Sequence, residues 1–244
     1  MSSTKYILLY NFKANPLCAF SFVSFVVKKI HGSGIVLSVL LASLLFSTCK
    51  TKKDPLALPF INKPDFTPEW IKETDPAFKS IHTIPSFSFT DQDGKTVTEK
   101  TVEGKIYVAD FIFTRCAGIC PKMTTNMGLL QQHFIKDDDV IFLSHSVTPD
   151  ADSVPVLKKY AEEKGAISGK WHLLTGDINK IYSIAKKEYY AGDTIGYYQT
   201  GNEFLHTENF ILVDKKRRIR GVYNGTVGVE MDRLIEDIGM LKKE

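Results

Sequence analysis

Residues 106–123 read IYVADFIFTRCAGICPKM, and they predict a buried strand that runs directly into the start of a helix. The first nine residues, 106–114, are almost all apolar, as in a strand that is covered on both faces. Pro121 suits the first turn of a helix, with Cys120 immediately before it as the expected cap. Two of the four cysteines of the chain, Cys116 and Cys120, therefore lie between this strand and this helix.

The segments around this stretch alternate between predicted strands and helices. An Asp-Gly turn in DQDG predicts a β-hairpin that begins at about residue 86. Beyond the helix that ends near Phe134 we expect strands at 140–147 and 171–176, helices at 152–165 and 178–189, an irregular stretch at 190–207, a hairpin of 210–214 with 219–223, and a closing helix at 230–243. This order predicts an α/β, thioredoxin-like fold: a central mixed sheet flanked by helices, an N-terminal β-hairpin and an insertion before the C-terminal hairpin.

Three regions are expected along the chain. Residues 1–49 are typical of a signal or lipoprotein leader or a membrane anchor, since two lysines precede an apolar run at 35–48 that is shorter than the ~20 residues of a membrane span. Ser-Thr-Cys at its end resembles a bacterial lipobox, which makes Cys49 a candidate for lipidation; an uncleaved anchor is the alternative. Residues 50–80 are proline-rich and predict a tether, and residues 81–244 predict the folded domain. The leader places this domain on the periplasmic side of a bacterial inner membrane.

The positive charge of the chain belongs to the leader. Residues 1–49 hold four lysines and no acidic residue, so the rest of the chain has 27 basic and 28 acidic residues. A nearly neutral domain offers no global electrostatic attraction to nucleic acid. We therefore expect no nucleic-acid partner.

With Cys18 and Cys49 in the leader, Cys116 and Cys120 are the two cysteines of the predicted domain. The pair could form a structural disulfide, a redox pair or a metal site, and its place at the ligand-binding edge of an open α/β sheet argues against an inert disulfide. Free N–H groups at a helix start favour thiolates. Thioredoxin-type enzymes use two intervening residues and a later cis-proline, whereas Pro155 is the last proline here. A general disulfide exchanger is thereby disfavoured but not excluded.

A metal site needs a third ligand, and His206 is the best candidate. It lies in an irregular segment just before a predicted strand, where that missing proline would face the cysteines, and it could complete a trigonal site for Cu(I). His145 is a weaker candidate on a buried strand, whereas His172 and His133 are better explained by packing and by a helix end. The remaining soft side chains are two methionines whose i, i+4 spacing favours core packing over ligation, Met123 and Met127.

The stretch FTRCAGICP at 113–121 and the distant His206, with SVTPDADSVPVLKKYAEE and WHLLTG between them, resemble the Sco/SenC family over residues 80–244. This resemblance implies a thioredoxin-fold, membrane-anchored domain that serves the dinuclear copper site of cytochrome c oxidase. It also implies copper ligation by Cys116, Cys120 and His206. Many members have Asp before the histidine, where this chain has Leu205, so an imidazole-orienting carboxylate would have to come from elsewhere.

Acidic residues near the predicted site allow more than one interpretation. Glu203 or Glu208 could replace the carboxylate that is missing at position 205. Asp150 and Asp152 match an acidic loop of the family and could shape the rim of the site, although capping of the following helix is the simpler expectation. The basic run KKRRIR at 215–220 could be a docking patch, but a solvated hairpin turn is the more ordinary interpretation.

The main functional hypothesis is a membrane-anchored copper chaperone, a carrier rather than an enzyme. It would bind one copper ion, as Cu(I) and/or Cu(II), and deliver it to the copper-site subunit of cytochrome c oxidase, after receiving it from an upstream copper donor. The alternative is a thiol-disulfide oxidoreductase in which Cys116 and Cys120 reduce the copper-ligand cysteines of that subunit and are themselves restored by a thiol reductant. A redox or copper sensor is a third hypothesis.

Overall fold

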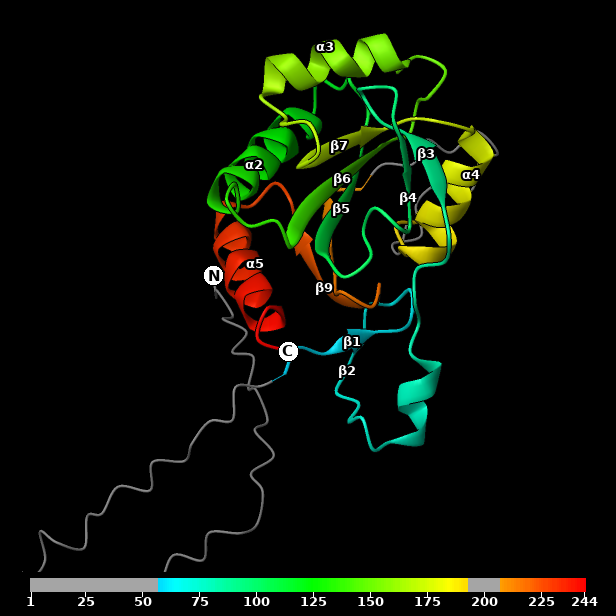
Figure 1. Cartoon of the computed structure of the whole chain (residues 1–244), viewed down its shortest axis with the longest axis vertical. Coiled ribbons are helices and arrows are strands. Elements are labelled where there is room, and N and C mark those ends of the chain that lie inside the picture. The colour runs from blue at the N-terminus through cyan, green and yellow to red at the C-terminus, as the bar shows by residue number, and fades with distance from the viewer. Residues whose placement is uncertain (1–56, 193–206) are drawn as a thin grey trace, which may run out of the picture. The chain divides into compact units, whose positions relative to one another are not determined.

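A five-stranded mixed sheet forms the centre of the computed structural model, which describes residues 57–192 and 207–244 (Figure 1). The spatial order is β7-β6-β5-β8-β9, and the strands are β5 (Ile106–Ile112), β6 (Val140–Ser146), β7 (Trp171–Leu174), β8 (Asn209–Val213) and β9 (Ile219–Asn224). The first three strands run parallel to one another, whereas β8 is antiparallel to both β5 and β9. The predicted mixed sheet flanked by helices is confirmed.

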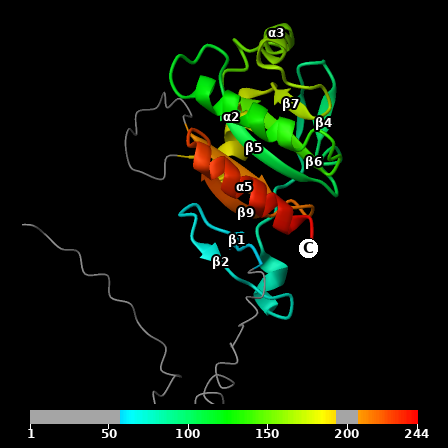
Figure 2. The same cartoon turned by 90° about the vertical axis from the view of Figure 1, so that its left-hand side faces the viewer.

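Every residue of β5 and β6 is buried, which explains the nearly continuous apolar sequence of both strands. One face of the sheet packs against α2 (Cys120–His133), α3 (Val154–Lys164) and α5 (Gly228–Leu241). Figure 2 shows α2 and α5 lying side by side over this face. The opposite face packs against a hairpin of β3 (Ser88–Thr90) with β4 (Thr96–Thr98), and against α4 (Ile178–Ser183) and η2 (Ile184–Glu188).

The predicted N-terminal hairpin is confirmed, and its turn is held by local hydrogen bonds. Asp91 accepts from the backbone N–H groups of Asp93 and Lys95, at 2.9 Å each, and Gly94 takes a φ of 73° that favours glycine. The hairpin is tied to the central sheet by a bridge between Thr90 and Thr175. It therefore serves as a cover for one face of the sheet.

The helix boundaries differ from the sequence predictions in four places, one of them the closing helix, which spans Gly228–Leu241 and not 230–243. Helix α2 begins at Cys120 itself, with Ile119 in the cap position, so Cys120 is not the cap. Helix α3 begins at Val154 and not at 152, because Ser153 has the extended backbone of a cap residue. The predicted helix 178–189 is α4 followed by a wider π-type turn, η2. The predicted C-terminal boundary at Gly165 is confirmed by its left-handed backbone, φ 70°.

Residues 57–80, most of the predicted tether, are folded against the domain. They form a short antiparallel pair, β1 (Phe60–Ile61) with β2 (Pro68–Glu69), and one 3-10 turn, η1 (Pro76–Ser80). Leu58, Phe60 and Ile61 are buried, and this apolar burial holds a proline-rich segment in place. The described residues from 57 onward thus belong to one compact unit.

Within the residues that the structure describes, none of the helices is long and apolar enough to span a membrane. The predicted leader lies outside those residues.

Candidate metal centre

Cys116 and Cys120 lie where β5 leads into α2, at the edge of the sheet to which the parallel strands point their carboxyl ends. Cys116 is half-buried in the connecting loop, and its backbone N–H donates to the carbonyl of Phe113 at 3.2 Å. Cys120 is buried as the first residue of the helix. No disulfide joins the two sulfurs in this structure.

The two thiols differ in acidity. Burial opposes ionisation of Cys116, but hydrogen bonds from the Cys120 thiol and from backbone N–H groups at 118–120 outweigh it and lower the pKa of Cys116. Burial raises the pKa of Cys120 to about 12, and a Cys116 thiolate beside it adds to the shift. Cys116 is therefore the half-buried, more easily ionised member of the pair, and Cys120 is the buried one that keeps its proton.

A buried carboxylate fastens the cysteine loop to the neighbouring strand. Asp152 accepts the Thr114 hydroxyl at 2.6 Å and the Thr114 backbone N–H at 3.3 Å. It also accepts the hydroxyls of Ser146 at 2.7 Å and Thr148 at 3.0 Å. Asp152 thus joins the end of β6 to the loop two residues before Cys116, and it does not cap α3 as the sequence suggested.

Asp110 is a second buried acid near the cysteines, and the sequence analysis missed it. It lies on β5, fully buried, and neither carboxyl oxygen has a hydrogen-bond partner within bonding distance. Burial raises the pKa of Asp110 to about 7, against a small opposing effect of the Ser144 hydroxyl. Its charge also acts on Cys120, whose pKa it helps to raise. One acidic residue inside an otherwise apolar strand was the signal that could have revealed it.

Of the three further histidines considered as ligands, His145 and His172 are buried and His133 is exposed. His145 is fully buried between the rings of Phe111 and Phe89, with centroids 5.1 and 5.6 Å away, and burial lowers its pKa to about 4. Its ring nitrogens have no hydrogen-bond partner in the described structure. His172 Nδ1 pairs with Asp91 Oδ2 at 2.9 Å. His133 is the exposed last residue of α2. The packing interpretation of His172 and the helix-end interpretation of His133 therefore agree with the structure.

Met123 and Met127 are both fully buried in the core beneath α2, as their spacing predicted. His206, Leu205 and Glu203 lie outside the described residues. Glu208 is exposed, and its carboxylate accepts the side-chain amide of Asn224 at 3.3 Å. Among residues 57–192 and 207–244, no three His, Cys, Asp or Glu side chains gather in a metal-binding arrangement. The two sulfurs are thus the part of the predicted ligand set that the structure describes.

The basic run 215–220 is used largely inside the molecule. Arg220 is 2% exposed and donates to the Glu244 carboxylate at 2.6 and 2.9 Å, and Arg218 pairs with Asp214 at 2.7 Å. Lys215 remains exposed, near Asp139 at 3.5 Å. The run is therefore neither a wholly solvated turn nor a continuous basic patch, because its two best-placed arginines are neutralised by acids.

Comparison with known proteins identifies the family of this thiol site. The SCO1/SenC family model matches residues 76–242, which include both cysteines and every strand of the central sheet. The chain belongs to the SCO1/SenC family. A SCO1 protein homolog of Bacillus subtilis is 33% identical over 157 residues, covering 64% of this chain and 80% of the relative.

Solved Sco structures share the fold. A SCO1/SenC family lipoprotein from Bacillus anthracis is 32% identical, with a TM-score of 0.59 over 66% of this chain and 95% of that one. BsSco, described with a disulfide switch and as a member of the Sco family of cytochrome c oxidase assembly proteins, is 32% identical, with a TM-score of 0.55 over 66% and 94% of the two chains. Copper-bound ScoI of Arabidopsis thaliana is 27% identical, with a TM-score of 0.51 over 64% and 97%. The SCO1/SenC domain therefore has the thioredoxin-like fold that the sequence predicted.

Proposed function

We propose that this SCO1/SenC protein is a copper carrier for the assembly of cytochrome c oxidase. It would hold one copper ion through Cys116, Cys120 and His206 and transfer it to the copper-site subunit of the oxidase. The observation that carries the proposal is the pair of cysteines at the β5–α2 edge, not joined by a disulfide, one half-buried and one buried. Copper in a related ScoI and the assembly role of BsSco support it.

The two thiols suit the capture and release of a soft cation. Thiolates and an imidazole are ligands that Cu(I) favours, and each thiol loses its proton as its sulfur binds the metal. Cys116, with its lowered pKa, is expected to bind first. Cys120 then gives up its proton to close the site. An incoming thiolate of the oxidase subunit would displace one sulfur at a time, so the ion changes ligands without changing its oxidation state.

The decisive experiment measures Cu(I) affinity of the full chain by competition with bicinchoninate under anaerobic, reducing conditions. The reduced protein should bind one copper ion per chain. Cys116→Ser and Cys120→Ser should each abolish tight binding, and His206→Ala should weaken it by roughly an order of magnitude or more. His133→Ala is the matched control, since His133 is an exposed histidine at the far end of α2. Wild-type affinity in His206→Ala would remove His206 from the ligand set.

A thiol-disulfide oxidoreductase is the second candidate, favoured by the unequal acidity of the two thiols. The Cys116 thiolate would attack a disulfide of the oxidase subunit, releasing one partner thiolate and forming a mixed disulfide. Cys120 would then attack Cys116, releasing the second partner thiolate and leaving this chain oxidised until an external dithiol reduces it.

The variants Cys120→Ser and His206→Ala distinguish the copper carrier from the oxidoreductase. Cys120→Ser should trap a mixed disulfide between Cys116 and an oxidised peptide that carries the two cysteines of the subunit, and His206→Ala should leave the reduction rate unchanged. A carrier should instead lose copper in both variants. Failure to trap any mixed disulfide would exclude the reductase.

Membrane attachment through residues 1–49, with the domain in the periplasm, is part of the same proposal. The leader pattern and the lipoprotein nature of the related Bacillus anthracis protein support it. Cells grown with labelled palmitate should label the wild type and not Cys49→Ala. Equal labelling of the variant would refute lipidation at Cys49.

A further inference from the structure

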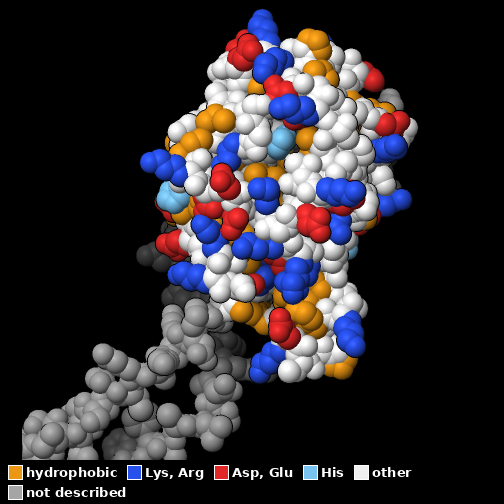
Figure 3. Space-filling model, viewed as in Figure 1, with side chains coloured by type: hydrophobic (Ala, Val, Ile, Leu, Met, Phe, Trp, Pro, Cys, Tyr) orange, Lys and Arg blue, Asp and Glu red, His pale blue; other side chains and the backbone are white. Residues whose placement is uncertain are grey.

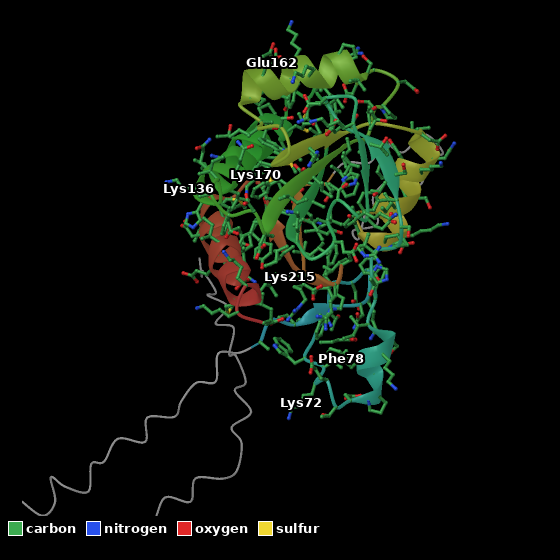
Figure 4. All side chains as sticks on the ribbon, in the orientation of Figure 1. Lys72, Phe78, Lys136, Glu162, Lys170 and Lys215 are labelled. Carbon is green, nitrogen blue, oxygen red and sulfur yellow. The ribbon has the colours of Figure 1, made fainter. Side chains whose placement is uncertain are left out.

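An apolar groove lies between residues 57–78, which precede the central sheet in the sequence, and the end of the sheet at which the β8–β9 turn lies. It has a volume of about 560 Å³. Its apolar lining residues are Ala57, Leu58, Phe60, Trp70, Ile71 and Phe78. Figure 3 shows hydrophobic side chains gathered beside charged ones where β1, β2 and η1 lie, and Figure 4 places Lys72 and Phe78 at this end.

Trp70 is the unusual member of this lining. Its side chain is 59% exposed, and its indole N–H donates to the carbonyl of Ala57 at 3.1 Å, which holds the ring at the mouth of the groove. The other strongly exposed large apolar side chains of the described residues are all aliphatic. Tryptophan with a bonded N–H and an exposed ring is the residue type that concentrates at membrane–water interfaces.

The floor of the groove carries no unpaired charge. The guanidinium groups of Arg218 and Arg220 lie over the Phe60 ring, 4.8 and 4.3 Å from its centroid. Both are neutralised by Asp214, and Arg220 also by Glu244. An ionic ligand therefore gains nothing at the floor, whereas apolar groups would meet an aromatic surface.

The groove and the cysteines lie at opposite ends of the sheet. The β8–β9 turn that carries Arg218 lies at the end where β5 begins, because Val213 pairs with Tyr107. Cys116 follows the other end of β5, after Ile112. At ~3.3 Å per residue, the seven residues of β5 separate the two ends by roughly 20 Å.

The sequence before the groove connects it to the predicted anchor. Cys49 precedes Ala57, which lines the groove, by eight residues, so even a fully extended connection reaches at most roughly 28 Å. Three lysines occupy that connection, at positions 50, 52 and 53, and exposed Lys72 and Lys79 flank the groove on the folded side. Acids offset the lysines on the folded side, where Glu73 lines the groove and Asp65 and Asp75 are also exposed. The connection itself holds three lysines against the single Asp54, and this excess of positive charge beside the groove favours an anionic headgroup layer.

We propose that this groove face rests on the anionic surface of the bilayer that holds the leader, with Trp70 inserted among the headgroups. The contact turns the opposite end of the sheet, with Cys116 and Cys120, away from the membrane toward a partner in the aqueous phase. The inference goes beyond copper transfer and depends on the predicted anchor, not on the ligand set.

The test uses the full chain reconstituted in vesicles of phosphatidylcholine and phosphatidylglycerol, with and without bromine on the acyl chains. Brominated lipid should quench a part of the tryptophan emission that is missing in Trp70→Phe, and the same part should be protected from iodide. Trp171 is 1% exposed and supplies a constant background. Leu129→Trp, made in the Trp70→Phe chain, is the matched control, because Leu129 is also 59% exposed but lies on α2.

The proposal would be overturned by equal Trp70 emission in both lipids, by iodide quenching of Trp70 as strong as at position 129, or by failure of the chain to float with the vesicles. If Trp70 stays protected from iodide without lipid, and sedimentation shows a dimer, the groove binds a second copy of the chain. That result would also overturn the membrane proposal. Trp70→Glu should lose the membrane contact and keep wild-type Cu(I) affinity. If the wild-type chain binds no copper, the proposed function is refuted, whereas the membrane contact is unaffected.

Discussion

Replacing Asp110 by Asn should stabilise the protein at neutral pH and not at acidic pH. Asp110 is fully buried on β5, and its carboxyl oxygens have no hydrogen-bond partner within bonding distance. Burial raises the pKa of this carboxyl to about 7, from an ordinary value of 3.8. Asn has nearly the same shape and cannot ionise, so the substitution removes the cost of keeping an acid inside the apolar core.

The sign and size follow from the two pKa values. Well below pH 3.8 the carboxyl is protonated in both the folded and the unfolded chain, and its ionisation costs nothing. As the pH rises from 3.8 toward about 7, the unfolded chain ionises while the folded chain keeps the proton, so stability is lost. At 1.36 kcal/mol per pKa unit, the loss amounts to about 4 kcal/mol at pH 8. The advantage of Asp110→Asn should therefore grow by about that much between pH 4 and pH 8.

Urea unfolding of the reduced, copper-free chain across this pH range measures the effect. The quantity to plot is the difference in unfolding free energy between Asp110→Asn and the wild type, because the packing cost of the amide is the same at every pH. Asp150→Asn is the matched control, since Asp150 is an exposed acid whose replacement should give a flat line. A flat line for Asp110→Asn as well would show that the buried carboxyl ionises normally and would refute the reasoning.

Three further predictions concern the cysteine loop and the sheet. Asp152→Ala removes the acceptor of all four hydrogen bonds, so unfolding by urea should show a loss of about 3 kcal/mol; an unchanged midpoint would mean that water replaces the carboxylate without cost. Iodoacetamide at pH 8 should alkylate Cys116 at least ~10-fold faster than Cys120, as followed by peptide mass spectrometry, because the thiolate is the reactive form; equal rates would contradict the assigned acidities. Gly221→Ala would place its methyl carbon 2.5 Å from the Tyr223 hydroxyl oxygen and should cost about 1–3 kcal/mol in thermal or urea unfolding, whereas a neutral effect would show that the Tyr223 ring can move aside.

Local patterns predicted most of the fold. The apolar run at 106–114, the Asp-Gly turn and the left-handed cap at Gly165 each act through near neighbours, so the corresponding strand, hairpin and helix end were predictable. The predictions were wrong where a distant contact decides the conformation. Residues 57–80 look like a tether by composition, but Phe60 packs beneath arginines more than 150 positions away in the chain.

The acidic residues show the same limit at the site. Asp152 precedes a helix, and by sequence alone a cap was the simplest role for it. Its actual partner Thr114 lies 38 residues earlier, on a loop that only the pairing of β5 with β6 brings close. Asp110 went unnoticed because its strand is apolar on average, and nothing local indicates which buried position faces Cys120.

By itself the sequence determined the chemistry that is available: two soft, ionisable sulfurs separated by three residues, held at a strand-to-helix junction, with a histidine far downstream. The tertiary structure alone decided how unequal those sulfurs are. Burial raises the pKa of both thiols, but hydrogen bonds from the Cys120 thiol and from backbone N–H groups bring that of Cys116 below its ordinary value. At Cys120 burial dominates, and the neighbouring Cys116 and Asp110 raise its pKa further. The physical reason is that a thiol ionises according to the solvent and charges around it, and those are set by residues that only folding brings into contact.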